Sequence, residues 1–260
     1  MKKNLKPPIR SLEKQNLWKN LLYAIVSLGY WILIGLFTLL LILPLWIWNL
    51  IRPSRVLSGK VIWLWSRIIR WFLPIRVIVV DEQKREPEDV YILIATQASH
   101  AETLIFPSVL PSDLIWVINK EYARIPVFGW ARKPNCIVID RNQKKAALKK
   151  LLRMAPKFLE KGISVGISPE GFRSKNGKLQ PFQNGPFVLA EKSKVKLLPV
   201  IAIGMEKILP YGSWIIRPGT VKILFKQFIL PENFSSSKEL QEYSHRFFSK
   251  VISENLTSPG

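Results

Sequence analysis

The heptapeptide Ser168–Ser174 brings together residue types that suit the binding of an anion. It reads Ser-Pro-Glu-Gly-Phe-Arg-Ser and follows the short apolar run 163–167. The guanidinium of Arg173 presents a planar fork of N–H donors that matches phosphate oxygens, and Gly171 permits a close approach of the backbone to a ligand. Taken alone, the segment with Glu170 is equally compatible with an ordinary Glu–Arg pair on a surface turn.

A second polar segment, residues 96–103, contains groups that could take a proton from a hydroxyl. It reads Thr-Gln-Ala-Ser-His-Ala-Glu-Thr and includes His100, one of two histidines in the chain. An imidazole accepts a proton near neutral pH, and Glu102 would do so if burial raised the pKa of its carboxyl. The amide of Gln97 forms hydrogen bonds only. On a helix, His100 would neighbour Gln97, whereas His100 and Glu102 would point to nearly opposite sides.

Alternating strands and helices must position these two segments. Apolar runs of strand type occupy residues 77–80, 90–95, 114–118, 137–139, 163–167, 196–203 and 221–225, and residues 143–161 and 240–256 have helical period. The alternation predicts an α/β fold with a mixed, mainly parallel sheet flanked by helices. Such sheets bind ligands at the carboxyl ends of their strands, where the loop Ser168–Ser174 falls. We expect this domain to cover residues 76–232, followed by a C-terminal amphipathic helix and tail over 233–260.

The N-terminal part of the chain is predicted to bind a membrane. Residues 1–20 form a basic tail, and no charged residue occurs from Leu21 to Ile51. This run exceeds the roughly 20 apolar residues of a spanning helix and is too long for a signal-peptide core, so a retained membrane helix is expected rather than a buried soluble one. Residues 52–73 alternate apolar and basic groups, which is typical of a helix among lipid headgroups. Residues 21–75 are therefore expected to be membrane-embedded and interfacial.

The charge of the chain favours an anionic membrane over nucleic acid as a partner. The formal net charge is +21, the mean hydropathy is +0.12, and Glu13 is the only acid within residues 1–80. Basic residues that flank apolar sequence suit a lipid surface, and no nucleic-acid-binding motif accompanies them. One cysteine and two histidines exclude an internal disulfide and argue against a metal site. We expect a membrane protein whose α/β domain lies on the cytoplasmic side.

Four sequence blocks, taken in order, resemble those of one family. They are residues 96–103; Lys120–Trp130 continuing to Ile139–Arg141; Pro169–Ser174; and Leu198–Gly204. Over roughly residues 77–230 the chain is similar to glycerolipid acyltransferases of the lysophosphatidate acyltransferase type. The resemblance implies transfer of a fatty acyl group to a lysophospholipid or glycerol-phosphate hydroxyl. The donor would be a thioester, acyl-coenzyme A or acyl carrier protein, with no further cofactor.

The resemblance also implies roles for individual residues. In the family's first block, a His takes the hydroxyl proton, and an Asp separated from it by four residues orients the imidazole. The family's Glu-Gly-x-Arg block holds the phosphate of the acceptor, which implies this role for Glu170, Gly171 and Arg173. Lys120 and Arg141 match positions that add positive charge near the same phosphate, and ordinary surface charge is an equal alternative for both.

The first block of this chain departs from the family pattern. Gln97 stands where the His is expected, and Glu102 stands where the Asp is expected. Loss of a general base costs about 10²–10⁴-fold in rate. The chain is then an enzyme that works through Gln97, His100 and Glu102, or a protein that binds lysophospholipid, acyl carrier or a partner enzyme without turnover. A basic surface binder with no lipid site fits less well, because the phosphate block is intact. The acyltransferase is our primary prediction.

Overall fold

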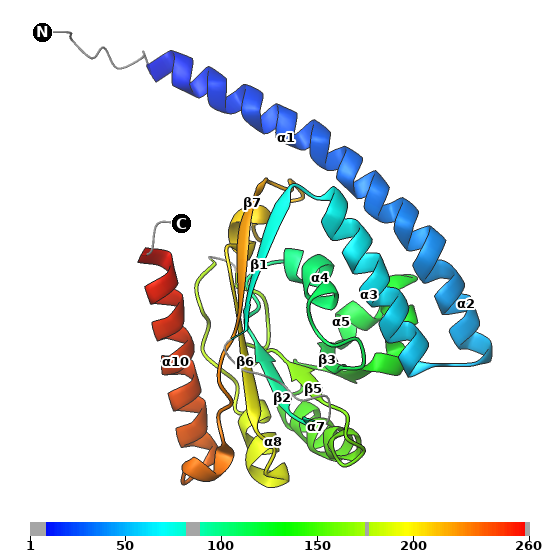
Figure 1. Ribbon diagram of the computed structural model, residues 1–260, viewed down its shortest axis with the longest axis vertical. Coiled ribbons are helices and arrows are strands. Elements are labelled where there is room, and N and C mark those ends of the chain that lie inside the picture. Colours follow the sequence, from blue (N-terminus) through cyan, green and yellow to red (C-terminus); the bar gives the residue numbers. More distant parts are fainter. Residues whose placement is uncertain (1–8, 82–88, 175–176, 258–260) are drawn as a thin grey trace, which may run out of the picture.

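A seven-stranded sheet forms the centre of the molecule (Figure 1). The computed structural model describes residues 9–81, 89–174 and 177–257. The strands are β1 (Ile75–Asp81), β2 (Ile92–Ala95), β3 (Ile115–Asn119), β4 (Cys136–Ile139), β5 (Val165–Ile167), β6 (Leu197–Ile203) and β7 (Gly219–Phe225). They lie in the order β1-β7-β6-β2-β5-β3-β4, and neighbours are parallel except for the antiparallel pair β6 and β7. The predicted mixed, mainly parallel sheet is confirmed.

Helices cover both faces of this sheet. One face carries α1 (Ile9–Phe37), α2 (Leu43–Ile51), α3 (Arg55–Phe72), α4 (Ala101–Ile105) and α9 (Met205–Ile208), and the other carries α7 (Lys144–Leu159), α8 (Gly185–Ser193) and α10 (Ser237–Thr257). The short helices α5 (Lys120–Ala123) and α6 (Phe128–Ala131) follow β3. Helices α7 and α10 were predicted from sequence, whereas α8 was not.

Strand β2 shows how one short apolar run supports two hydrophobic cores. All of its residues are buried. Leu93 and Ala95 pack in the core beneath α1, α3 and α4, whereas Ile92 and Ile94 pack in the core beneath α7, α8 and α10. Successive side chains of a strand point to opposite faces, so a strand covered on both faces has no polar positions. The carboxyl end of β2 is thus held rigidly between two packed layers.

The N-terminal helix is longer than the uncharged run that predicted it. Helix α1 begins at Ile9, so residues 9–20 of the predicted tail are helical, and residues 1–8 lie outside the described residues. A π-helical turn, Thr38–Ile42, joins α1 to α2 without a break. Pro44 follows directly in the first turn of α2. Because proline has no N–H to complete an α-helical hydrogen bond, the wider turn is favoured there.

Helix α3 buries one apolar face of residues 52–73, the segment predicted to lie among lipid headgroups, and exposes Val56, Leu64 and Trp71. Its apolar face, with Ile62, Trp65 and Ile69, is buried in the same core as Leu93 of β2. This face therefore packs on protein and is not available to lipid headgroups. Helices α1 to α3 and the sheet share one hydrophobic core. The boundary expected at residue 75 therefore does not separate two cores.

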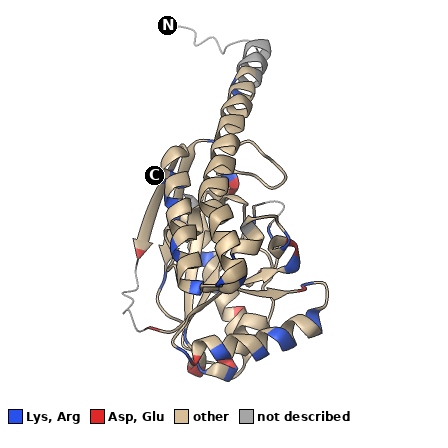
Figure 2. Cartoon of the chain, turned by 90° about the vertical axis from the view of Figure 1, so that its right-hand side faces the viewer, with Lys and Arg blue, Asp and Glu red and all other residues tan. Residues whose placement is uncertain are grey.

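The outer side of α1 and α2 remains apolar and exposed. The helical stretch Trp18–Ile51 is long and apolar enough to cross a membrane, and only 17% of its most apolar window is buried within the molecule. Its exposed apolar residues are Trp18, Leu21, Leu22, Ile25, Val26, Leu28, Ile32, Leu36, Leu39, Leu40, Ile47, Trp48, Leu50 and Ile51. Figure 2 shows how sparse charged residues are along this helix compared with the domain below it. An apolar surface of this extent marks a site of interaction with lipid or protein.

Candidate active site

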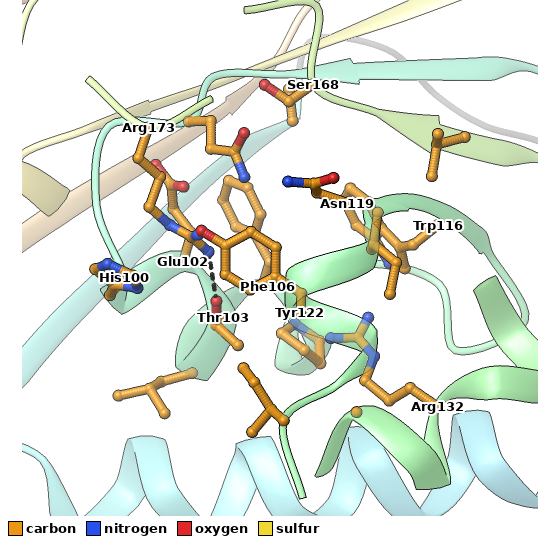
Figure 3. A pocket seen from close by; sticks show the side chains of 18 of the residues that line it. His100, Glu102, Thr103, Phe106, Trp116, Asn119, Tyr122, Arg132, Ser168 and Arg173 are labelled. Carbon is orange, nitrogen blue, oxygen red and sulfur yellow. Dashed lines mark hydrogen bonds between the residues drawn. The ribbon is translucent and has the colours of Figure 1, made fainter. Parts of the chain in front are cut away.

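A cavity of about 250 Å³ lies at the carboxyl ends of β2, β3 and β5 (Figure 3). Helix α4 and the segment that follows β3 form its sides, and Trp31 reaches it from α1. Its polar lining residues are Thr96, Gln97, His100, Glu102, Thr103, Asn119, Tyr122, Arg132, Arg141, Ser168 and Arg173, and Phe106 and Trp116 contribute apolar surface. Most residues that the sequence singled out therefore meet in one place.

Arg173 is buried in this cavity and held by three hydrogen bonds. Its side chain comes from the loop after β5 and is only 8% exposed. Its Nε donates to the carbonyl of Ser99 at 3.1 Å, its Nη2 donates to Thr103 Oγ1 at 2.9 Å, and its Nη1 donates to the Tyr122 hydroxyl. The guanidinium carbon also lies 4.5 Å from the centre of the Tyr122 ring. These contacts fix the plane of the fork before any ligand arrives and leave two of its five N–H donors.

Glu170 lies behind the cavity and does not line it. Its Oε1 accepts the backbone N–H of Gln97 at 2.7 Å, and its Oε2 accepts that of Gln180 at 2.8 Å. The residue is 1% exposed, and burial raises the pKa of its carboxyl while the two N–H groups oppose that rise. Glu170 thus ties the loop after β2 to the loop after β5. In the structure Glu170 braces the segments that carry Gln97 and Arg173, outside the residues that line the cavity.

Gly171 and Lys120, two further predicted phosphate ligands, also lie outside the cavity lining. Gly171 has φ of +81°, a left-handed conformation that favours glycine, and it lines a neighbouring groove. Lys120 Nζ pairs with Asp140 Oδ2 at 2.6 Å near the surface. The hydrogen bond from Lys120 is the main cause that lowers the pKa of Asp140.

Arg141, in contrast, does line the cavity. Its backbone N–H bonds to Asn119 Oδ1 at 3.4 Å, while its guanidinium has no hydrogen bond or ion pair among the described residues. Burial lowers its pKa to about 10, against the opposing charge of Glu121, so it is still cationic at neutral pH. Arg141 is therefore the second cationic side chain, after Arg173, that could bind an anion in the cavity.

Glu102 is buried at the start of α4 and faces the cavity. Its Oε1 accepts the N–H of Ala98 at 2.7 Å and that of Ser99 at 3.3 Å, while Ser99 Oγ accepts the N–H of Ala101 at 3.0 Å. These bonds tie Glu102 to the backbone of the residues that precede α4, whose N-cap is His100. Oε2 has no hydrogen bond among the described residues, and the side chain is 4% exposed. Burial raises the pKa of Glu102 to about 8, against the opposing Ala98 N–H and Arg173 charge.

His100 lies at the open side of the cavity. Its side chain is exposed, and its ring centre is 6.3 Å from that of Tyr211. Partial burial, and then the charge of Arg173, lower its pKa from the ordinary value, so the imidazole is neutral at neutral pH. Figure 3 shows it on the far side of Arg173 from Asn119 and Trp116.

Gln97 and Ser168 leave polar atoms unsatisfied beside the cavity. Gln97 Oε1 and Ser168 Oγ are buried and have no hydrogen-bond partner among the described residues. Buried polar atoms are nearly always paired, so such atoms mark positions that a ligand can satisfy. Arg173, Arg141 and these two acceptors therefore line one cavity with an ionisable carboxyl, Glu102.

Sequence reasoning did not single out two lining residues, Trp116 of β3 and Trp31 of the predicted membrane helix. No local pattern marks either of them as a site residue, and only the packing of α1 against the sheet brings Trp31 to the cavity. Thr103 and Tyr122, in contrast, lay within the first two sequence blocks, and the structure gives both a contact with Arg173.

The chain belongs to the acyltransferase family of the lysophosphatidate acyltransferase type. The family model described as Acyltransferase matches residues 76–203. A 1-acyl-sn-glycerol-3-phosphate acyltransferase of Pseudomonas aeruginosa is 32% identical over an alignment of 204 residues, and the match covers 73% of this chain and 77% of that protein. One of Helicobacter pylori is 29% identical over 168 residues, 63% of this chain and 70% of that protein.

The fold also matches a crystal structure. The 1-acyl-sn-glycerophosphate acyltransferase PlsC from Thermotoga maritima superposes with a TM-score of 0.76 and 21% identity. The match covers 92% of this chain and 99% of that one. Because the match leaves out only 8% of this chain, the shared architecture extends into the N-terminal helices.

Proposed function

We propose that this protein transfers a fatty acyl group from an acyl thioester to the free hydroxyl of lysophosphatidate or a related lysophospholipid. The observation that carries this proposal is the buried, prearranged Arg173 in one cavity with the carboxyl of Glu102. A guanidinium binds a phosphate monoester, and a carboxylate beside it can take a proton from a nearby hydroxyl. Membership of the family supports the same reaction.

The phosphate of the acceptor is assigned to Arg173 and Arg141. Arg173 retains two N–H donors after its protein contacts, and Arg141 retains its whole fork. Charge-assisted hydrogen bonds of this kind contribute about 1.5–3 kcal/mol each. Glu170 and Gly171 serve this site indirectly, through the shape of the loop that carries Arg173.

The N-terminal helices support a position of the cavity next to lipid. Trp31 lines the cavity from one side of α1, while Ile32 on the same helix is 65% exposed. With the exposed apolar side of α1 and α2 in a bilayer, a lysophospholipid reaches Arg173 without leaving the membrane surface. The basic surface of the domain then belongs on the anionic, cytoplasmic side.

Glu102 is proposed to act as the general base in place of the His expected at position 97. Its ionised carboxylate takes the proton of the acceptor hydroxyl, whose oxygen attacks the carbonyl carbon of the thioester. A carbon–oxygen bond forms, the carbon–sulfur bond breaks, and the departing thiolate takes the proton back from Glu102. A pKa of about 8 leaves part of the carboxyl ionised at neutral pH, near the optimum for proton transfer. The unpaired Oε1 of Gln97 is then free to accept a hydrogen bond from the hydroxyl.

The alternative is a protein that binds lysophospholipid or acyl carrier without turnover. It is favoured by the amide at Gln97, which cannot accept a proton. The two functions differ in one measurable quantity, the rate of product formation at saturating substrate.

Transfer of a hexadecanoyl group from coenzyme A to lysophosphatidate by the full chain tests the proposal. Glu102→Gln keeps the oxygen that accepts the Ala98 and Ser99 N–H groups and removes the base, so it should lower kcat about 10²–10⁴-fold. Wild-type kcat should rise with pH through about 8, because the ionised form is active.

His100→Asn is the matched control and should retain most activity. If it abolishes turnover instead, the base is His100. A silent wild type that gains activity through Gln97→His would establish the binding function and overturn the catalytic one.

A further inference from the structure

Helix α7 carries an unbalanced row of positive charge. Lys145, Lys149, Arg153 and Lys157 recur every four residues, which places them along one side of the helix. All four are exposed, and Lys144 and Lys150 flank them. The helix contains no acidic residue.

These cations have no acidic partners among the described residues. Elsewhere in the domain Lys120 pairs with Asp140 and Lys196 pairs with Asp89. No such pair involves the row on α7, which extends about 18 Å at a rise of about 1.5 Å per residue. An extended, unpaired basic row attracts a partner whose surface is acidic over a similar length.

An apolar groove lies beside this helix and adjoins the active-site cavity. It has a volume of about 290 Å³ and runs between the first turns of α7, the start of α8 and the loop after β5. Lys144 and Leu148 lie on its α7 side. Arg141 and Ser168 line both the groove and the active-site cavity, so the two spaces are adjacent at those residues.

We propose that α7 is the docking surface for an acyl carrier protein, and that the phosphopantetheine arm of the carrier lies in the groove. This rests on the proposed acyl transfer and names its donor. The acidic surface of the carrier pairs with the basic row. The narrow arm then passes Leu148 and delivers the thioester to the junction at Arg141 and Ser168, beside Glu102 and the acceptor.

The position and length of the row favour a carrier protein over the two other anionic partners. Helix α7 packs on the face of the sheet opposite to α1, α2 and α3, so a membrane held by those helices does not reach it. Coenzyme A gathers its phosphates at one nucleotide, which needs a compact cluster of cations. A row of about 18 Å matches a protein surface instead.

Direct binding separates this proposal from the catalytic one. Surface plasmon resonance on the full chain in detergent measures the affinity for purified holo- and apo-acyl carrier protein, and no turnover is required. The triple change Lys145→Glu, Lys149→Glu and Arg153→Glu should weaken binding of both forms at least about tenfold. A matched reversal of exposed lysines on α8 and α10, Lys192→Glu, Lys238→Glu and Lys250→Glu, should change affinity less than about twofold.

The groove is tested by Leu148→Trp, which narrows it without altering charge. Binding of the holo form should weaken, while binding of the apo form, which has no arm, should not change. Equal binding by the reversed row and wild type, or no binding of holo-carrier by wild type, overturns the proposal. The proposal is also overturned if the charge-reversed variant loses binding to vesicles of anionic phospholipid and keeps its affinity for the carrier. If the charge-reversed variant fails to fold, the affinity for the carrier is measured instead in a variant with neutral Lys→Gln changes in the row, and the salt dependence of binding is measured in wild type. Unchanged affinity in the neutral variant, or wild-type binding that does not weaken with salt, overturns the proposal.

Discussion

The two buried carboxyls at this site, Glu170 and Glu102, have similar surroundings and different uses. They are 1% and 4% exposed, and each accepts two backbone N–H groups. Glu170 uses one oxygen for each bond and stays behind the cavity wall. Glu102 takes both bonds on Oε1, so its Oε2 is left toward the cavity. Both oxygens of Glu170 hold two loops together, whereas Glu102 keeps one oxygen that can accept a proton.

The largest expected effect is the pH dependence that Glu102 gives to stability. Its pKa is 4.5 ordinarily and about 8 in the folded protein, so between these values the folded state holds a proton that the unfolded state has lost. Stability should therefore fall as pH rises from 4.5 to 8, by at most about 5 kcal/mol. Chemical denaturation in detergent across this range measures the slope, and Glu102→Gln should flatten it.

Glu170→Gln is the matched control for that slope. Burial raises the pKa of Glu170 as well, so this change should also flatten the profile, and by less, because both of its oxygens are hydrogen-bonded. An equal slope in Glu102→Gln and wild type would show that the two carboxyls do not differ as the structure indicates.

Glu170→Ala should cost the most stability at a single pH, about 4 kcal/mol. It leaves the N–H groups of Gln97 and Gln180 buried without an acceptor, at about 1–3 kcal/mol each, and opens a small cavity. The midpoint of denaturant unfolding measures it. If Glu170→Ala lowers the free energy of unfolding by less than about 1 kcal/mol, Glu170 does not brace the loops. It would then be considered again as a ligand of the phosphate.

Sequence reasoning found the sheet because its strands are mostly apolar. Five of its candidate residues, Gln97, His100, Glu102, Arg141 and Arg173, line one cavity, because the blocks that contain them are local patterns. Sequence reasoning did not distinguish the two carboxyls. The N–H groups that occupy Glu170 belong to residues 73 and 10 positions away, and no local pattern reports such a contact. Helix α3 is a similar case. The sequence pattern of an apolar helix face is the same whether that face contacts lipid or packs in a protein core with Leu93.

Arg173→Lys should weaken binding of the acceptor by about 2 kcal/mol, roughly a 30-fold rise in KM for lysophosphatidate. Lysine keeps the charge and loses the fork that meets Ser99, Thr103 and the Tyr122 hydroxyl together. Steady-state kinetics should show the change in KM with a smaller change in kcat. Arg124→Lys, at an exposed arginine outside the cavity lining, should leave both constants near wild type. An unchanged KM in Arg173→Lys would assign the phosphate to Arg141 alone.

Ser168→Ala should have the smallest effect on stability, within about 1 kcal/mol of wild type, because the buried Oγ has no partner to lose. Ser174→Ala, at a serine of the same loop whose Oγ accepts from Gln180 Nε2 at 3.2 Å, should instead cost about 1 kcal/mol. Thermal unfolding of both variants gives the difference. In the transfer assay Ser168→Ala should raise KM several-fold, because its hydroxyl lies where the acceptor and the donor groove meet. The opposite order, with Ser168→Ala the less stable and kinetically silent, would mean that Ser168 is structural and that the reacting groups meet elsewhere.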